Sequence, residues 1–463
     1  MSDTTPIAHV ARLPDEAELG RFRRRAVVVS GMGFFADSYD LFVIGIVSTL
    51  LKGQWHLDSS QLALLNAVML GAAFLGAMVL GRIADLVGRK RVYWVNAVAM
   101  VIAAIGSALA PSLLVLTAFR FLLGFGVGGN YPASAVLMTE YAGPSNRGRL
   151  VGLVFSAQAA GLIVGPLVAL ALLGGGASAD LTWRLLLGLG AVPALAVIWL
   201  RRKMPESPRY QAARANAGHR QRTGSRADAK PGLGLRGFFA NRRFLVMLGA
   251  TAGCWFLLDY AYYGNTISTP QIISLISPHA SDTVTIAIQL VIFVVAALPG
   301  YLLAIARMDR IGHRKLQLIG FVVMSACFAV IGLVPGMTTA VVPFLLVYGI
   351  SYFFAEFGPN VTTFVLPGEI FPTAVRATGH GLAAGAGKLG AFIGVFLFPV
   401  LQHSLGLRGT LLLTAVVSAL GALLTLVLPE PAGRSLEEIC GEAEVIPAAT
   451  LLMSDAGGSV SAA

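Results

Sequence analysis

The sequence is poor in charged residues. Only 12% of its 463 residues are Asp, Glu, Lys or Arg, which is about half the share found in an ordinary soluble domain. The mean hydropathy is +0.75, and 56% of the residues are apolar, enough for roughly a dozen membrane spans of ~20 residues each. The composition therefore excludes a soluble enzyme and predicts a polytopic membrane protein.

Cysteine is also scarce. Cys254, Cys327 and Cys440 lack metal-ligand spacing, and two of them lie inside apolar runs, so we interpret them as small packing residues. The first 26 residues have neither the apolar stretch nor the cleavage site of a signal peptide, so we expect the first span to direct insertion. With no metal cluster, nucleophile elbow or nucleotide loop to support an integral-membrane enzyme, we expect no enzyme, no metal and no cofactor.

The basic residues are unevenly placed. Of the 34 Lys and Arg residues, 29 lie in clusters at the ends of the chain or in every second gap between apolar runs, whereas the alternate gaps hold only Lys52, Arg184 and Arg408. This asymmetry predicts that both termini and the long central loop are cytoplasmic. It accounts for the net charge of +11 and leaves no basic surface for nucleic acid.

Twelve apolar runs divide into two sets of six. We expect an all-α protein of twelve transmembrane helices, with runs at 27–51, 61–84, 92–110, 112–138, 149–174, 182–201, 244–276, 283–306, 315–335, 339–366, 376–402 and 407–428. Residues 202–243 are too polar to pack a core. The predicted organisation is a cytoplasmic segment (1–26), a six-helix half (27–201), a linker (202–243), a second half (244–428) and a cytoplasmic tail (429–463).

The two halves repeat each other. "GRIADLVGRKR" after the second span matches "ARMDRIGHRK" after the eighth, so Asp85 and Asp309 occupy equivalent places. Glu140 and Glu369 likewise follow the fourth and tenth spans. Two repeated six-helix halves are the signature of a secondary transporter whose site lies at the repeat interface.

Charged residues near the span ends suggest a cytoplasmic gate that holds one conformation closed. The alternative is that they only set the membrane topology. We favour the gate because the acidic residue recurs in both halves, and we group Arg376 with Glu369. The predicted gate residues are Asp85, Arg89, Arg120, Glu140, Asp309 and Glu369.

The string "GFGVGG" at 124–129 resembles a dinucleotide-binding loop, but no strand precedes it and it lies within an apolar run. Small residues at this spacing allow close packing of transmembrane helices. We therefore interpret it as a helix contact.

Two carboxylates lie close to mid-membrane in the first span. Asp37 and Asp40 are about 11 to 14 residues into the helix, or roughly 17 to 21 Å at 1.5 Å per residue, and they share a face. Two carboxylates in a low-dielectric setting do not easily both ionise, so at least one should exchange protons near neutral pH. The alternative is helix packing, with both acids neutral or paired with Lys388.

The seventh span carries Trp255, Asp259 and Tyr263 at positions i, i+4 and i+8. This spacing stacks an aromatic ring, a carboxyl group and a phenol along one face of a helix. Such a stripe is usually core, but an acidic residue about 15 residues into a span is expensive in lipid or in a dry core. We therefore favour a binding stripe.

Lys388 is the strongest pointer to anion chemistry. It lies near the centre of the eleventh span, where an ammonium group needs either a carboxylate partner or an anionic substrate. Other polar residues within the spans could bind substrate or form interhelical hydrogen bonds: Asn130, Tyr131, Gln158, Glu356 and Asn360.

Nearly the whole chain resembles the major facilitator superfamily, and several strings resemble its phosphate:proton symporter family: "GMGFFADSYDLFVIGIVS", "GGNYPASAVLMTEYA", "AGCWFLLDYAYYG", "FGPNVTTFVLPGEIFPTAVRATGHG" and "GKLGAFIG". The resemblance implies a proton-coupled anion transporter in which Asp37 and Asp40 match the proton pathway. The residues it assigns to the substrate site are Tyr131, Gln158, Trp255, Asp259, Tyr263, Asn360 and Lys388.

One residue departs from the family pattern. The family typically has an acid in the "GG-acid-YP" string, where this chain has Asn130. An amide carries no proton, so either coupling relies on Asp37, Asp40 and Asp259 or the substrate and stoichiometry differ. Glu356 is an additional acid near the site that offers compensation.

We expect a proton-coupled importer of an inorganic anion, with phosphate favoured. It would act by alternating access as a monomer in the plasma membrane, or in the inner membrane of a bacterium. The alternatives are an organic-anion or aromatic-acid symporter and a nutrient sensor that scarcely moves its substrate. The sensor would be favoured by large signalling domains, which the sequence lacks.

Overall fold

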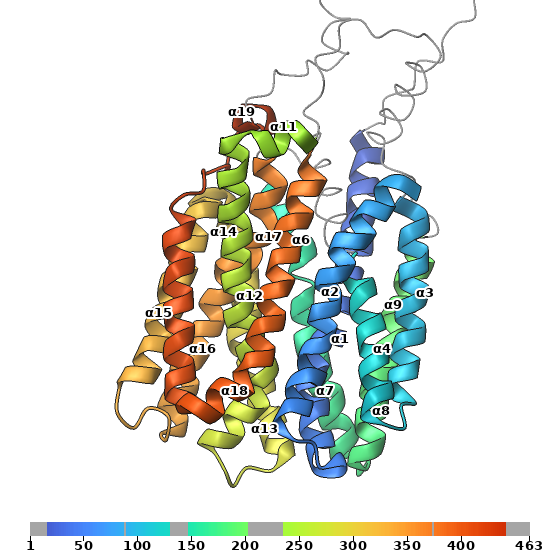
Figure 1. The fold of residues 1–463 in the computed structure, drawn as a ribbon, viewed down its shortest axis with the longest axis vertical. Coiled ribbons are helices and arrows are strands. Elements are labelled where there is room, and N and C mark those ends of the chain that lie inside the picture. Colours follow the sequence, from blue (N-terminus) through green and yellow to red (C-terminus); the bar gives the residue numbers. More distant parts are fainter. Residues whose placement is uncertain (1–15, 88, 130–146, 202–234, 373–374, 441–463) are drawn as a thin grey trace, which may run out of the picture.

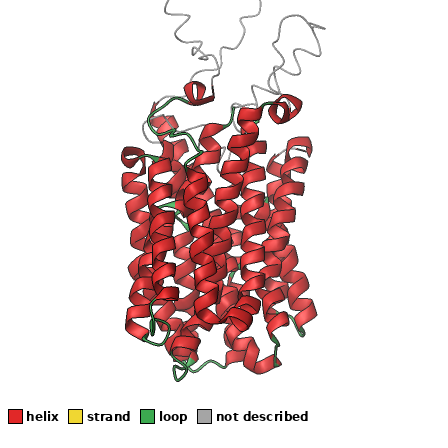
Figure 2. Cartoon of the chain, turned by 60° about the vertical axis from the view of Figure 1, so that its left-hand side comes forward, coloured by secondary structure: helices red, strands yellow, loops and turns green. Residues whose placement is uncertain are grey.

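The computed structural model describes residues 16–87, 89–129, 147–201, 235–372 and 375–440, and these parts contain helices and loops without strands (Figure 2). The helices run side by side as a bundle (Figure 1). We call the end at which α11 (Leu235–Ala240) and α19 (Leu436–Cys440) lie the linker end. It is the end that the charge pattern predicts to be cytoplasmic.

The first half contains eight described helices. Two of its spans are broken into consecutive pieces, α6 with α7 and α8 with α9. The bounds are α1 Glu16–Trp55, α2 Ser59–Val87, α3 Arg89–Ala108, α4 Leu113–Gly128, α6 Arg147–Phe155, α7 Gln158–Gly174, α8 Ala179–Leu189 and α9 Ala191–Arg201.

Two membrane spans of the second half are interrupted, and each interruption lies near buried polar side chains. Gly358, with φ −117° and ψ −104°, separates two pieces of one span, α16 and α17. In another span, a π-helical turn, η1, joins the helices α13 and α14. The bounds are α12 Arg242–Ile276, α13 Asp282–Ile292, η1 Phe293–Ala297, α14 Leu298–Ile311, α15 His313–Leu333, α16 Val341–Phe357, α17 Pro359–Ile370 and α18 Arg376–Thr425.

The described helices agree with the predicted twelve-helix class, although the fourth run, 112–138, is described only as far as Gly129. Within the described ranges, nine stretches are long and apolar enough to cross a membrane, and Trp94–Ala108 and Leu113–Gly128 are shorter apolar helices. The 50-residue α18 contains the last two predicted runs. It bends at Gly406, whose φ of +68° lies in the left-handed region that favours glycine.

The glycines of "GFGVGG" bring two helices into close contact, as predicted. A Cβ atom added at Gly124 would come within 2.1 Å of the carbonyl oxygen of Met69, and one at Gly128 within 2.0 Å of that of Ala73. Both carbonyls belong to α2. The motif therefore serves α2–α4 packing.

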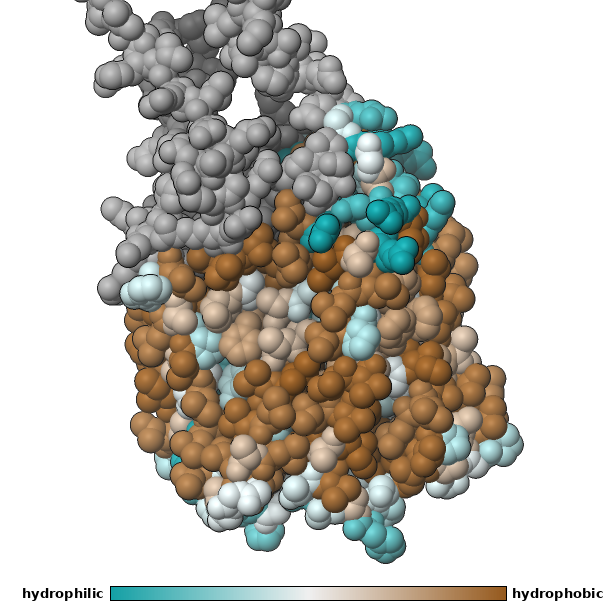
Figure 3. Space-filling view, turned by 180° about the vertical axis from the view of Figure 1, so that it is seen from behind, coloured by the Kyte–Doolittle hydropathy of each residue, from teal (hydrophilic) through white to brown (hydrophobic). Residues whose placement is uncertain are grey.

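The face of the bundle drawn in Figure 3 is dominated by apolar side chains between its two ends. Leu114, Val295 and Leu346 are more than 60% exposed. Such exposure would be unfavourable in water and is expected of a lipid-facing belt. The buried polar residues lie inside the bundle, away from this belt.

The halves touch each other at several levels. α2 packs against α18, α1 against α12, α7 against α13, and α6 against both α14 and α17. On the side of the bundle away from the linker end, Gly45 of α1 lies against the backbone of Ile267 in α12. Described residues of the two halves therefore contact each other near both ends of the bundle.

Candidate functional site

Lys388 lies in α18 with only 2% of its surface exposed. Its Nζ donates to Asp259 Oδ2 at 3.1 Å and to the Tyr263 hydroxyl at 3.0 Å, and it also lies 4.3 Å from the centre of the Tyr263 ring. Both partners come from α12, where a spacing of four places them on one face. The structure thus gives Lys388 a carboxylate partner within its own half.

Trp255 completes the stripe one turn before Asp259. It is buried, and its ring lies against Gly387, where an added Cβ would approach Cδ1 to 2.4 Å. Its ring also makes edge contacts with Phe364 and His380. Along this face of α12, Asp259 and Tyr263 contact Lys388, whereas Trp255 packs against the rings of Phe364 and His380.

A second polar cluster joins the halves. Gln158 of α7 donates from its side-chain amide to the hydroxyl of Tyr301 in α14, and Asn360 of α17 donates to the same hydroxyl at 2.8 Å. Gln158 and Asn360 were predicted as site residues, and the structure brings them together through Tyr301. The phenol of Tyr301 is thus a direct link between the two halves.

Tyr301 was not among the predicted residues. It stands alone in the apolar string "LPGYLLAIA", and no spacing on its own helix points to a polar role. The only local signal was that a polar hydroxyl follows Pro299 and Gly300 within an otherwise apolar run.

The two acids of the first span are both buried. Asp40 lies against the break between α8 and α9, because a Cβ at Gly190 would meet its Oδ1 at 2.0 Å. Arg120 of α4 is fully buried and donates to the backbone carbonyl of Asp40 at 2.6 Å. Asp37 is equally buried, at 1% exposure.

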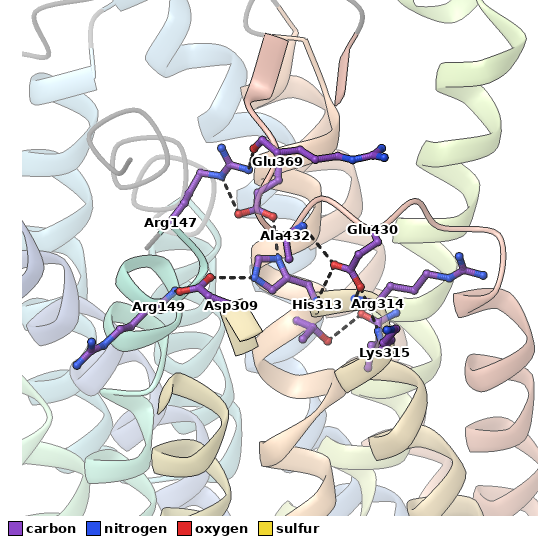
Figure 4. Close-up of polar contacts among 12 residues, drawn as sticks. Arg147, Arg149, Asp309, His313, Arg314, Lys315, Glu369, Glu430 and Ala432 are labelled. Carbon is purple, nitrogen blue, oxygen red and sulfur yellow. Dashed lines mark hydrogen bonds and ion pairs between the residues drawn. The ribbon is translucent and has the colours of Figure 1, made fainter. Parts of the chain in front are cut away.

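A charged cluster joins the two halves at the linker end (Figure 4). Arg147 Nε of α6 forms an ion pair with Glu369 Oε1 of α17 at 2.8 Å, with both side chains at most 3% exposed. The other oxygen of Glu369 lies 2.8 Å from His313 Nδ1. His313 Nε2 lies 3.3 Å from Asp309, which also accepts from the backbone N–H of Arg149 at 3.1 Å.

We call Arg147, Asp309, His313 and Glu369 the linker-end cluster. Asp309 and Glu369 were predicted for a gate, whereas Arg147 and His313 were not. Both missed residues stand in the repeated strings after the fourth and eighth spans, "NRGRLVG" and "ARMDRIGHRK", and that repetition was the available signal.

Arg120 and Arg376, which were grouped with the gate, make other contacts. Arg120 contacts α1 in the interior rather than the linker-end cluster. Arg376 donates from Nε to the carbonyl of Phe371 at 3.1 Å. Asn130, Tyr131 and Glu140 lie outside the described residues, as do the side chains of Asp85 and Arg89.

The segment that follows the last span is tied to the same end. The carboxylate of Glu430 accepts from the backbone N–H groups of His313, Arg314 and Lys315, at 2.8, 3.1 and 3.4 Å (Figure 4). These are unpaired donors of the first turn of α15, so Glu430 caps that helix. The carbonyl of Arg434 accepts from Arg147 at 3.3 Å.

Among the described residues, no group of three or more His, Cys, Asp or Glu side chains is arranged to hold a metal ion. The described side chains at the centre include the ammonium of Lys388, carboxylates, phenols and amides. Such a set can bind an anion and exchange protons, as an ion-coupled transporter requires.

Comparison with known proteins identifies the fold and the relatives. The Major Facilitator Superfamily model matches residues 30–394 and 260–454. The chain is 35% identical to inorganic phosphate transporter 1-6 of Oryza sativa subsp. japonica, covering 93% of this chain and 94% of that protein. It is 34% identical to inorganic phosphate transporter 1-1 of Arabidopsis thaliana, covering 94% and 98%.

Solved structures agree on the fold. The proton:xylose symporter XylE bound to 6-bromo-6-deoxy-D-glucose matches with a TM-score of 0.75 at 20% identity, over 91% of this chain and 98% of that one. A partially occluded inward open conformation of XylE from E. coli matches with a TM-score of 0.69 at 21% identity, over 90% and 100%. The chain is a multi-pass membrane transporter and not an enzyme. It belongs to the Major Facilitator Superfamily and, within it, to the family of these inorganic phosphate transporters.

Proposed function

We propose that this transporter imports inorganic phosphate together with protons by alternating access between its two halves. The observation that carries the proposal is the contact of Lys388 with Asp259 and Tyr263 inside the bundle. A buried ammonium held by one carboxylate and one phenol is a site that an anion can enter by replacing the carboxylate. The curated relatives at about 35% identity are named inorganic phosphate transporters.

A proton on Asp259 starts the proposed binding step. Protonation removes the negative charge beside Lys388, so the ammonium becomes available to the oxygens of phosphate. The neutral carboxyl group then no longer repels the anion and can share hydrogen bonds with it. The remaining donors of the proposed substrate site are Tyr131, Gln158, Trp255, Tyr263 and Asn360.

Asp37 and Asp40 complete the proposed proton route together with Asp259. Both lie buried in α1, the helix of the first half that packs against α12. Since a buried carboxylate is expensive when ionised, each should take up or release its proton only when one side of the bundle opens.

The linker-end cluster acts as the proposed cytoplasmic gate. Its ion pair joins α6 of the first half to α17 of the second, so it must break when the site opens toward the linker end. Asp85, Arg89 and Glu140 are proposed to assist at the same end, whereas Arg120 is better suited to hold α1 against α4.

The proposed organisation follows the charge asymmetry. Residues 1–26, 202–243 and 429–463 would face the cytoplasm, and the two six-helix halves, 27–201 and 244–428, would span the plasma membrane, or the inner membrane in a bacterium. The transporter would act as a monomer, because its site lies between two halves of one chain.

Uptake of labelled phosphate into proteoliposomes with an alkaline interior tests the proposal. We expect accumulation above that in protein-free liposomes, abolition by a protonophore, and competition by unlabelled phosphate rather than by sulfate or benzoate. Uptake competed by benzoate would favour an aromatic-acid symporter. Binding of phosphate without any uptake would favour a sensor.

A further inference from the structure

Glu356 is a buried acid that the proposed function does not use. It lies in the last turn of α16, two residues before the break at Gly358, and its exposure is 0%. It neighbours the cluster of Gln158, Tyr301 and Asn360, but it is not part of the Lys388 site. Its surroundings indicate what such an acid can do.

Glu356 is surrounded by donors without a positive charge. Its Oε2 accepts from the side-chain amide of Asn360 in α17, and Tyr301 of α14 and Tyr262 of α12 lie near enough to interact with it electrostatically. Tyr352 of α16 also lies near enough to interact electrostatically. Among the described residues no Lys, Arg or His forms an ion pair with Glu356, and its Oε1 has no hydrogen-bond partner.

This environment favours the neutral acid while the bundle is closed. An ionised carboxylate away from water costs several kcal/mol unless a cation offsets its charge, and none is present in the described part of the site. We therefore expect Glu356 to carry a proton when the halves are packed around it. It can lose that proton only when water reaches it.

The proton on Glu356 is coupled to the contact between the halves. The amide nitrogen of Asn360 donates both to Glu356 and to Tyr301, and Tyr301 accepts from Gln158 of the first half. A charged carboxylate attracts such donors more strongly than a neutral acid does. Ionisation of Glu356 would thus draw Asn360 and Tyr301 toward it and weaken the bridge to Gln158.

The sequence gives an independent reason for an acid here. In the family string that typically reads "GG-acid-YP", this chain has Asn130 and so lacks one protonatable group. Glu356 supplies a carboxyl group inside the bundle, on the half opposite to that string.

We propose that Glu356 carries one of the transported protons, taking it up before the halves close and releasing it when the site opens to the linker end. The proposal rests on the proposed proton-coupled function. The step moves a proton only: water on one side protonates the carboxylate, and water on the other side removes the proton from the carboxylic acid. The Gln158–Tyr301–Asn360 bridge is intact only while the proton is bound.

The test measures phosphate flux and proton flux in the same vesicles. Wild type, Glu356→Gln and Glu356→Asp are reconstituted, and labelled phosphate and an internal pH dye are followed after phosphate is added outside. Gln keeps the size and polar contacts of the side chain but cannot titrate, whereas Asp keeps the titration. Asp282→Asn, an exposed acid at the end of the bundle away from the linker, is the matched control.

We expect Glu356→Gln to keep phosphate/phosphate exchange, to move fewer protons per phosphate, and to lose at least about 10-fold of its uphill accumulation. Glu356→Asp and Asp282→Asn should resemble wild type in protons moved per phosphate. An unchanged proton-to-phosphate ratio in Glu356→Gln would overturn the proposal even if phosphate is the substrate. Phosphate uptake by wild type without proton movement would instead overturn the proton-coupled function, and this proposal with it.

Discussion

Two buried ion pairs in the described part of the chain differ in what they connect. Lys388 and Asp259 both belong to the second half, whereas Arg147 and Glu369 come from different halves. Both pairs are almost fully enclosed, so breaking either one leaves an uncompensated charge at a cost of about 3–5 kcal/mol. A pair within one half affects binding, while a pair between the halves affects which conformation is populated.

The largest effect should come from removing the ammonium at the centre. Lys388→Ala is expected to weaken phosphate binding by about 100-fold, because the anion loses its only proposed cationic partner. Equilibrium binding of labelled phosphate to purified protein measures this. The double variant Lys388→Ala/Asp259→Asn removes the stranded carboxylate, and it should fold better yet still fail to bind; near-normal affinity in either variant contradicts the site assignment.

Replacing the other member of the central pair separates binding from coupling. Asp259→Asn removes a proposed proton carrier and leaves Lys388 charged, so exchange of phosphate should persist while uphill uptake driven by a pH gradient is lost. Counterflow and gradient-driven uptake in the same vesicles measure the two activities. Undiminished accumulation against a gradient would rule out Asp259 as a proton carrier.

Breaking the pair between the halves should shift conformation with a smaller effect on affinity. In Glu369→Gln, Arg147 and His313 lose their shared carboxylate, so the linker end should open more often. The check is a Val151→Cys reporter in a background lacking the native cysteines, because Val151 is buried in α6. We expect labelling by an impermeant maleimide from the linker end to be faster by about 10-fold or more.

A surface ion pair is the matched control for that experiment. Arg434 and Glu438 are 3.6 Å apart, and both side chains are 59% exposed; such pairs contribute at most about 1 kcal/mol. Glu438→Gln should leave the labelling rate of the reporter unchanged. Equal rates in Glu369→Gln and wild type would mean that the linker-end cluster does not govern opening.

The smallest expected effect concerns the residue that departs from the family pattern. Asn130→Asp adds a carboxyl group to the first half, so uptake should depend more steeply on pH between about pH 5 and 8, with its optimum shifted toward acid. Phosphate uptake by wild type and variant across that range gives the comparison. Superimposable profiles would show that position 130 does not take part in coupling.

The sequence was sufficient to predict the helices but not all their partners. Apolar runs and charge asymmetry locate the spans because lipid imposes a length and a polarity on each of them. Spacing of four residues could place Asp259 and Tyr263 on one face, since it concerns a single helix. The spacing could not show which of Asp37, Asp40 and Asp259 pairs with Lys388, because the pairing depends on how α1, α12 and α18 pack.

Tyr301 and His313 were not predicted from the sequence, because their contacts also depend on how distant helices pack. Tyr301 gains its importance from Gln158 and Asn360, which lie 143 and 59 residues away in the chain. His313 is one basic residue among several in its loop until Glu369 is packed beside it. Contacts between distant segments leave no periodicity in the sequence.

The cap formed by Glu430 has a consequence for biosynthesis. Glu430 and Arg434 follow the last membrane helix, yet they contact α15 and Arg147. A ribosome makes the first half, the linker and all of the second half before it reaches them. The earlier helices therefore enter the membrane before Glu430 can cap α15 and before Arg434 can contact Arg147. These contacts form only after the last helix has entered the bilayer.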